Sequence, residues 1–201
     1  YCTWRGAQVL AKTGGFGGDE RDDADEDSRV MNRVVETAQL VLDVATPTGL
    51  DPDAEDSFAM NTGLRVRLVH AAVRRLILEF SRWDAAKFGK PLNELDMLGT
   101  LMAFSIAPTI AMHKWGLPPD DEGEQAWLDV WNMVGELMGV RADLLPRTVA
   151  DAIVAWNVVV DLQSEDDPDG FTPRAQGRDL CHDLIRFLQD RVLKGRLYDG
   201  M

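Results

Sequence analysis

The sequence contains little of what several common classes of protein need. Only two cysteines occur, Cys2 and Cys181, and there is no Cys-x-x-Cys pair. The chain therefore has neither a disulfide framework nor a thiolate pair for zinc. It carries 21 lysines and arginines against 34 acidic residues, a net charge of -13. Nucleic acids and anionic membranes both attract basic surfaces, so this balance argues against a nucleic-acid partner and against electrostatic membrane docking.

Strand patterns and membrane-length apolar runs are also missing. The apolar portion from Gly99 to Met112 is shorter than the ~20 residues that cross a bilayer, so we interpret it as a buried helix and expect no transmembrane segment. There is no period-two alternation and no internal repeat. The glycine cluster 14–18 lacks the preceding strand and the Lys-Ser/Thr sequel of a phosphate loop. These absences favour an all-α protein.

Helical periodicity, caps and breakers predict about six main helices in a single domain over residues 1–201. The acidic run Asp19–Asp27 is expected to be a solvated loop and Lys87–Pro91 a turn. The expected helices are about Arg29–Ala45, Gly63–Trp83, Glu94–Trp115, Asp121–Met138, Pro146–Gln163 and Arg174–Lys194. A start at Tyr1 without methionine suggests a piece of a longer protein, so localisation (cytoplasmic or secreted) and oligomeric state stay open.

The predicted helix Gly63–Trp83 carries the residues with the clearest chemical potential. His70 falls within an apolar stripe that we expect to be buried: Val66, Val69, Val73, Ile77 and Phe80. At about 100° per residue, Arg67 and Arg74 lie roughly 60° and 40° to one side of His70. Leucines cover much of the remaining circumference, so we expect most of this helix to be inside the protein.

Two interpretations of this helix are open. A neutral imidazole in an apolar wall can bind a metal, and flanking arginines can hold anionic groups, which together are what a haem and its propionates require. Alternatively, His70 is a core histidine hydrogen-bonded to a carbonyl, and the arginines pair with carboxylates. Because there is no Cys-x-x-Cys-His, any haem would be held non-covalently.

The pattern Arg67-x-x-His70-x-x-x-Arg74 is accompanied by further motifs in a fixed order. These are Trp4 to Gly14, Arg33 to Thr37, Gly89 to Asn93 with Thr100 and Phe104, and Trp131 to Gly139. Together they resemble the rubber-oxygenase catalytic domain, a family that includes bacterial latex-clearing proteins and MpaB-type oxygenases. The resemblance extends from Tyr1 to about Pro146.

The resemblance implies a globin-like core with additional helices around haem b, and a haem-dependent oxygenase. His70 is then the proximal iron ligand, and Arg67 and Arg74 anchor propionates or orient neighbouring groups. Rubber and prenyl chains, the family's substrates, are cleaved by O2 at a carbon-carbon double bond, giving carbonyl products. The resemblance therefore implies an apolar small molecule or polyisoprenoid as substrate, recognised mainly by burial.

The resemblance also places Arg33, Glu36 and Thr37 on the oxygen side of the haem. The family motif there resembles Arg-x-x-Lys-Thr, whereas this chain has Glu36 at the lysine position. A glutamate cannot replace a neutral amine that caps the iron, so Glu36 could instead serve as a general base. From spacing alone, a surface ion pair between Arg33 and Glu36 is an equal alternative.

The other two histidines are poor ligand candidates. His113 lies in the last turn of its predicted helix, where a positive charge favours the carbonyl end. Asp179-x-x-His182 is half of a di-iron signature without a second copy. Two other functions remain open: a haem-free helical module that binds a lipid-like ligand, and a haem protein that carries or senses gas without oxygenase chemistry.

Overall fold

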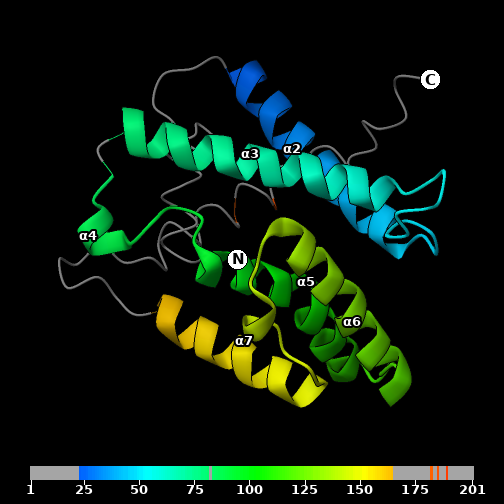
Figure 1. Cartoon of the computed structure of the whole chain (residues 1–201). Coiled ribbons are helices and arrows are strands. Elements are labelled where there is room, and N and C mark those ends of the chain that lie inside the picture. Colours follow the sequence, from blue (N-terminus) through cyan, green and yellow to red (C-terminus); the bar gives the residue numbers. More distant parts are fainter. Residues whose placement is uncertain (1–22, 82, 165–181, 183–184, 186–188, 190–201) are drawn as a thin grey trace. The chain divides into compact units, whose positions relative to one another are not determined.

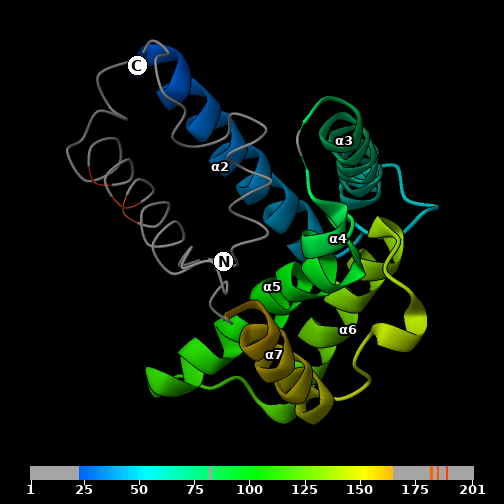
Figure 2. The same ribbon diagram turned by 90° about the vertical axis from the view of Figure 1, so that its left-hand side faces the viewer.

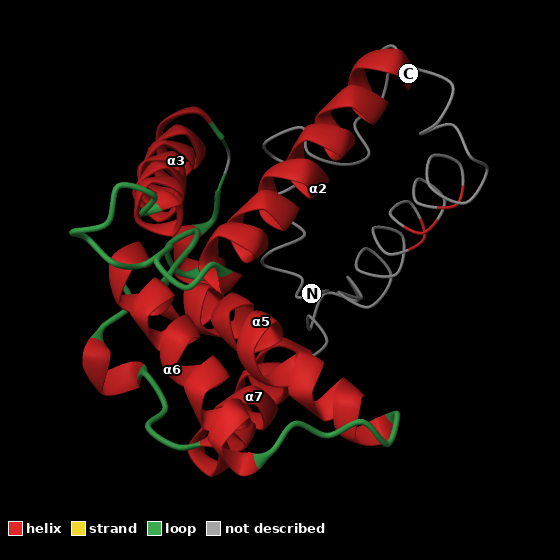
Figure 3. Ribbon diagram, turned by 90° about the vertical axis from the view of Figure 1, so that its right-hand side faces the viewer, coloured by secondary structure: helices red, strands yellow, loops and turns green. Residues whose placement is uncertain are grey.

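The computed structural model describes residues 23–81 and 83–164, together with positions 182, 185 and 189. Within these residues all regular structure is helical and no strand occurs (Figure 3), which confirms the all-α prediction. The predicted helix at 174–194 and the motif at 4–14 lie outside the described residues. The globin-like arrangement stays a prediction.

The helices follow one another in the order shown in Figure 1. They are α2 (Asp23–Ala45), α3 (Phe58–Phe80), α4 (Ala85–Phe88), α5 (Glu94–Lys114), α6 (Asp121–Met138), the 3-10 turn η1 (Ala142–Leu144) and α7 (Val149–Ser164). The chain divides into two compact units, one of residues 36–162 and one of the two ends, 1–35 and 163–201. The site discussed below is built mainly from residues 36–162, and the single domain stays a prediction.

The helices α5 and α6 lie where their capping residues predict them. The Asn93 side chain accepts hydrogen bonds from the backbone N–H groups of Leu95 and Asp96 and begins α5. Gly139 ends α6 with a φ of 92°, the left-handed conformation that glycine adopts without strain. Pro108 inside α5 has no N–H for the Phe104 carbonyl. The indole of Trp127 donates to that carbonyl instead, at 3.2 Å.

Four element boundaries differ from the expected ones. The helix α2 begins at Asp23, within the acidic run expected to be a loop, because acidic residues favour the positive end of a helix. The short helix α4 (Ala85–Phe88) was not predicted and includes the first two residues of the expected turn Lys87–Pro91. The helix α3 runs from Phe58 to Phe80, five residues earlier at its start than predicted. The helix α7 begins after Thr148, whose hydroxyl accepts from the Asp151 N–H at 3.1 Å.

The core forms where α5, α6 and α7 meet. Its largest fully buried apolar side chains are Trp131, Met102, Ile106 and Leu128. The helix α3 packs on α6 at Gly63, where a Cβ atom would lie 2.3 Å from the Leu137 side chain. A small residue is therefore needed at that crossing.

The expectation that α3 is mostly buried is wrong. Ile77 is buried, but Val69 is 57% exposed and Phe80 is 79% exposed, although both belong to the predicted stripe. Leu64, Leu68, Leu76 and Leu78 are exposed as well. Periodicity identifies an apolar face but not how much of it a neighbouring element covers.

The helix α5 is long and apolar enough to cross a membrane by length and composition, and 33% of its most apolar window is buried. Six of its residues point into the core: Leu98, Leu101, Met102, Ser105, Ile106 and Thr109. The helix α5 thus contributes to the core, but it is longer than the apolar portion considered in the sequence analysis, and the absence of a transmembrane segment stays a prediction.

Candidate functional site

The helix α3 places His70 in a half-buried position, with Arg67 and Arg74 on the same helix. The ring atom Nδ1 of His70 is buried and has no hydrogen-bond partner in the part of the chain that the structure describes. Burial, and then the neighbouring Arg74 charge, lower the pKa of His70 from its ordinary value of 6.5. The imidazole is therefore neutral at neutral pH, which is the form that binds a metal.

Arg74 binds the turn that precedes α5. Its Nε donates to the Pro91 carbonyl at 3.1 Å and a terminal nitrogen donates to the Leu92 carbonyl at 2.6 Å. Leu92 has a φ of 54°, a conformation that is uncommon for a residue other than glycine. Two guanidinium hydrogen bonds therefore hold a strained turn in place against α3.

Arg67 binds the carboxyl end of α6. One terminal nitrogen donates to the Leu137 carbonyl at 3.1 Å. The guanidinium also lies against Gly139, where a Cβ atom would be 3.3 Å from its central carbon. A cation at this position satisfies a free carbonyl and interacts favourably with the negative end of the helix.

These contacts bring together three motifs that are far apart in the sequence. Arg74 joins the central motif to the segment Gly89–Asn93, and Arg67 joins it to Trp131–Gly139. Neither arginine needs a carboxylate for this, and Nδ1 of His70 is not bonded to a carbonyl. The two arginines therefore bind backbone carbonyls, and the roles of His70, Arg67 and Arg74 stay predictions.

The residues predicted on the oxygen side lie on α2. Glu36 and Thr37 are exposed, whereas Arg33 belongs to the helix but its side chain lies outside the described residues. Their role therefore stays a prediction. Farther along α2, Asp43 is buried and accepts hydrogen bonds from Gln39 at 2.6 Å and from the Thr62 hydroxyl of α3 at 2.9 Å.

Asp43 is thus a buried polar residue joining α2 to α3 that sequence reasoning missed. The Gln39–Asp43 spacing of four was a signal for the first of these hydrogen bonds. The partner on α3 could not be read from the sequence.

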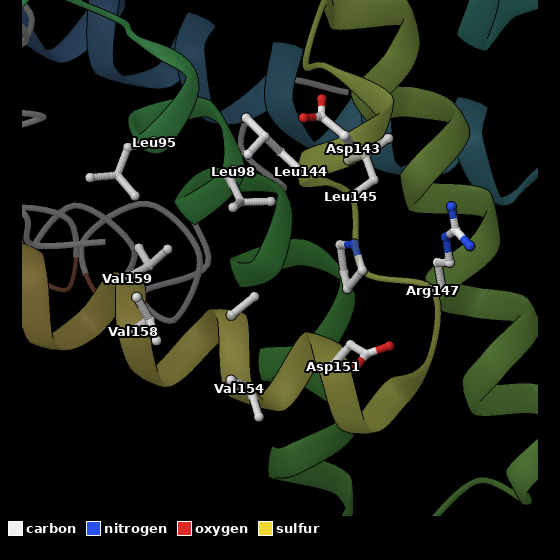
Figure 4. Close-up of a pocket in the computed structure, with 12 residues that line it drawn as sticks. Leu95, Leu98, Asp143, Leu144, Leu145, Arg147, Asp151, Val154, Val158 and Val159 are labelled. Carbon is white, nitrogen blue, oxygen red and sulfur yellow. The ribbon is translucent and has the colours of Figure 1, made fainter.

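An open, mostly apolar pocket of about 530 Å3 lies between α5, η1 and α7 (Figure 4). Its aliphatic lining residues are Leu95, Leu98, Leu144, Leu145, Val154, Ala155, Val158 and Val159. Arg147, Asp143 and Asp151 also line it, and Figure 4 shows Arg147 and Asp151 toward the end where α7 begins. His70 is not among the lining residues, so this pocket and the imidazole are separate features.

In the described ranges, no group of three or more histidine, cysteine, aspartate or glutamate side chains could hold a metal ion. A metal ion at His70 would therefore need ligands that these side chains do not supply, and a porphyrin would supply them. His113 is exposed and its ring pairs with Glu124, and His182 is exposed, so neither shares the surroundings of His70.

The lowered pKa of His70 predicts how stability depends on pH. As the pH falls, the unfolded chain takes up a proton on His70 at a higher pH than the folded chain does. The contribution of His70 to the free energy of unfolding is therefore greatest above about pH 6.5, where the ring is neutral in both states. It is lost progressively as the pH falls below that value. Urea unfolding should show that, below this pH, the free energy of unfolding falls more steeply for the wild type than for His70→Gln. If it changed with pH in the same way for both proteins, the lowered pKa of His70 would be contradicted.

Residues 7–198 match the family described as "ER-bound oxygenase mpaB/B'/Rubber oxygenase, catalytic domain". The chain is similar to a rubber oxygenase of Streptomyces sp. (strain K30), with 26% identity over 121 residues. This match covers 59% of the chain but 29% of that relative. No solved structure matches the chain.

Proposed function

The chain belongs to the MpaB and rubber oxygenase catalytic-domain family, and on this premise we propose that it is a haem b-dependent oxygenase. Its substrate would be an isoprenoid or another apolar molecule with a carbon-carbon double bond. Cleavage of that bond by O2 accounts for all atoms, because the two oxygen atoms end in the two carbonyl groups formed. When bound, haem supplies a redox-active iron for this reaction.

The observation that carries the proposal is the neutral His70 imidazole with its unpaired, buried nitrogen. A neutral imidazole is the form that binds a metal. An unpaired buried nitrogen costs free energy, and a metal ion or another group that binds the ring would remove that cost. Val66 and Val73 lie one turn away on each side, half-buried, and would keep water from the ring.

The two arginines would hold the carboxylates of the porphyrin. Arg74 uses two of its five N–H donors on the turn before α5, and Arg67 uses one on α6. The remaining donors suit propionate groups, which guanidinium binds in forked pairs. Because both arginines also bind protein carbonyls, their positions are fixed before any ligand arrives, which lowers the entropy cost of binding.

On the oxygen side we propose roles for Arg33, Glu36 and Thr37. The Glu36 carboxylate would accept a proton, and Arg33 and Thr37 would orient neighbouring groups. The exposure of Glu36 on α2 supports a position at which protons exchange with water.

The visible absorbance spectrum tests the cofactor first. The purified protein should show a Soret band, or should acquire one on titration with haemin. The haem-loaded protein should then form aldehydes or ketones from a polyisoprene or a prenylated compound in the presence of O2. A haem spectrum without carbonyl products would support a gas-carrying protein instead.

The apolar pocket between α5 and α7 favours a second candidate function, a haem-free module that binds a hydrophobic ligand. Its volume of about 530 Å3 is within the range of ligand sites and its lining is mainly aliphatic, although the pocket is open to solvent. A preparation that remains colourless after haemin titration but binds a fluorescent fatty acid would favour this candidate.

A further inference from the structure

The turn between α5 and α6 presents bulky apolar side chains to solvent. Trp115 is 75% exposed and Leu117 is 67% exposed, and Met112 in the preceding helical turn is 38% exposed. Figures 2 and 3 show from opposite sides that this end of α5 extends beyond α6 and α7. We call residues 115–119 the α5–α6 tip. Exposed apolar groups gathered at one projecting point are typical of an interaction site.

The backbone of the α5–α6 tip has no unpaired N–H group. The N–H groups of Trp115, Gly116 and Leu117 donate to carbonyls of α5 at 3.0–3.1 Å, in the pattern that closes a helix end at a glycine with positive φ. Pro118 and Pro119 have no N–H. An unpaired donor costs several kcal/mol in a lipid phase. The N–H groups of this tip therefore carry no such penalty at an apolar boundary.

The charges around the α5–α6 tip suit an uncharged lipid surface. Residues 115–119 carry no charge, although the chain as a whole has a net charge of -13. Lys114 lies immediately before them and can reach lipid phosphates. Acidic residues follow directly: Asp120, which caps α6 through its bond to the Gly123 N–H, and then Asp121, Glu122 and Glu124. Tryptophan also prefers the boundary between headgroups and acyl chains.

From these three observations we propose that the α5–α6 tip inserts into the interface of a zwitterionic phospholipid bilayer. Trp115 and Leu117 would enter the headgroup and acyl boundary, and Lys114 would remain at the phosphates. The interaction depends on burial of apolar surface, so it should be insensitive to salt. It is independent of haem and of the proposed oxygenase activity.

Sedimentation of the full chain with phosphatidylcholine vesicles tests the proposal. We expect wild-type binding in low and high salt, with a blue shift of tryptophan fluorescence. Trp115→Ser should weaken partitioning by about tenfold or more, because it removes a large apolar group from the interface. The matched control is Phe80→Ser, which removes an aromatic that is 79% exposed at the end of α3. This control should bind vesicles like the wild type.

Several results would overturn the proposal. Failure of the wild type to bind, or equal loss in both variants, would exclude a specific role for the tip. Binding that requires anionic lipid would attribute it to charge. Loss of a dimer in Trp115→Ser, measured by light scattering and without vesicle binding, would make the tip a contact between copies of the chain. Circular dichroism of both variants separates these results from misfolding.

Discussion

Replacing His70 by alanine is expected to abolish stoichiometric haem binding. A group that only hydrogen-bonds to a metal ligand contributes 10–100-fold in metal affinity, so loss of the ligand itself should weaken binding by more than about 100-fold. The Soret band of the titrated variant should resemble that of free haemin. Difference spectra during haemin titration measure this directly.

Two controls make the result specific to position 70. His113 is exposed and pairs with Glu124, and His182 is exposed, so alanine at either position should leave haem affinity unchanged. The helix α3 tolerates alanine well, and unfolding curves should show that His70→Ala remains folded. A folded His70→Ala protein that still binds one haem with unchanged affinity would remove His70 as the ligand.

Replacing Trp131 by alanine should produce the largest loss of stability among the tryptophan variants. Trp131 is 2% exposed and stacks on Phe104 with ring centroids 4.9 Å apart, while Trp127 meets it edge-on at 5.8 Å. Loss of a buried aromatic to alanine costs about 3–5 kcal/mol. This is a large part of the ~5–15 kcal/mol that stabilises a typical domain. Urea or thermal unfolding measures the change.

Two further substitutions distinguish the loss of a buried ring from the loss of the indole N–H group and from the loss of an exposed tryptophan. The Nε1 atom of Trp131 is buried and has no hydrogen-bond partner among the described residues. Trp131→Phe keeps a stacked ring and removes that unpaired donor, so it should cost much less than alanine. Trp115→Ala removes the same residue type from an exposed position and should change stability by less than about 0.5 kcal/mol. Equal losses for Trp131→Ala and Trp115→Ala would contradict the assigned core.

Local signals explain why α5 and α6 were predicted closely. Asn93 and Gly139 specify the beginning of α5 and the end of α6 through hydrogen bonds to residues a few positions away. Where such a local signal was misinterpreted, the predicted helix boundary was wrong. The acidic run before residue 28 was expected to be a loop, yet its charges suit the first turns of α2.

The candidate site was predicted in composition but not in its contacts. The motif that contains Arg67, His70 and Arg74 identified the family, which the match over residues 7–198 confirms. The sequence did not indicate that the two arginines bind the Leu137, Pro91 and Leu92 carbonyls, because those partners are 17 to 70 positions away. The apolar pocket was missed for the same reason.

The sequence by itself determined the helical class, most helix ends and the family, because caps, periodicity and short motifs act within a few residues of one another. Only the tertiary structure decided which side of α3 is covered, where its arginines are bound and which apolar side chains remain in solvent. These depend on close approaches such as that of Gly63 to Leu137, which arise from the packing of whole helices. Amphipathic periodicity reports a preference for burial, but a neighbouring helix must be present to satisfy it.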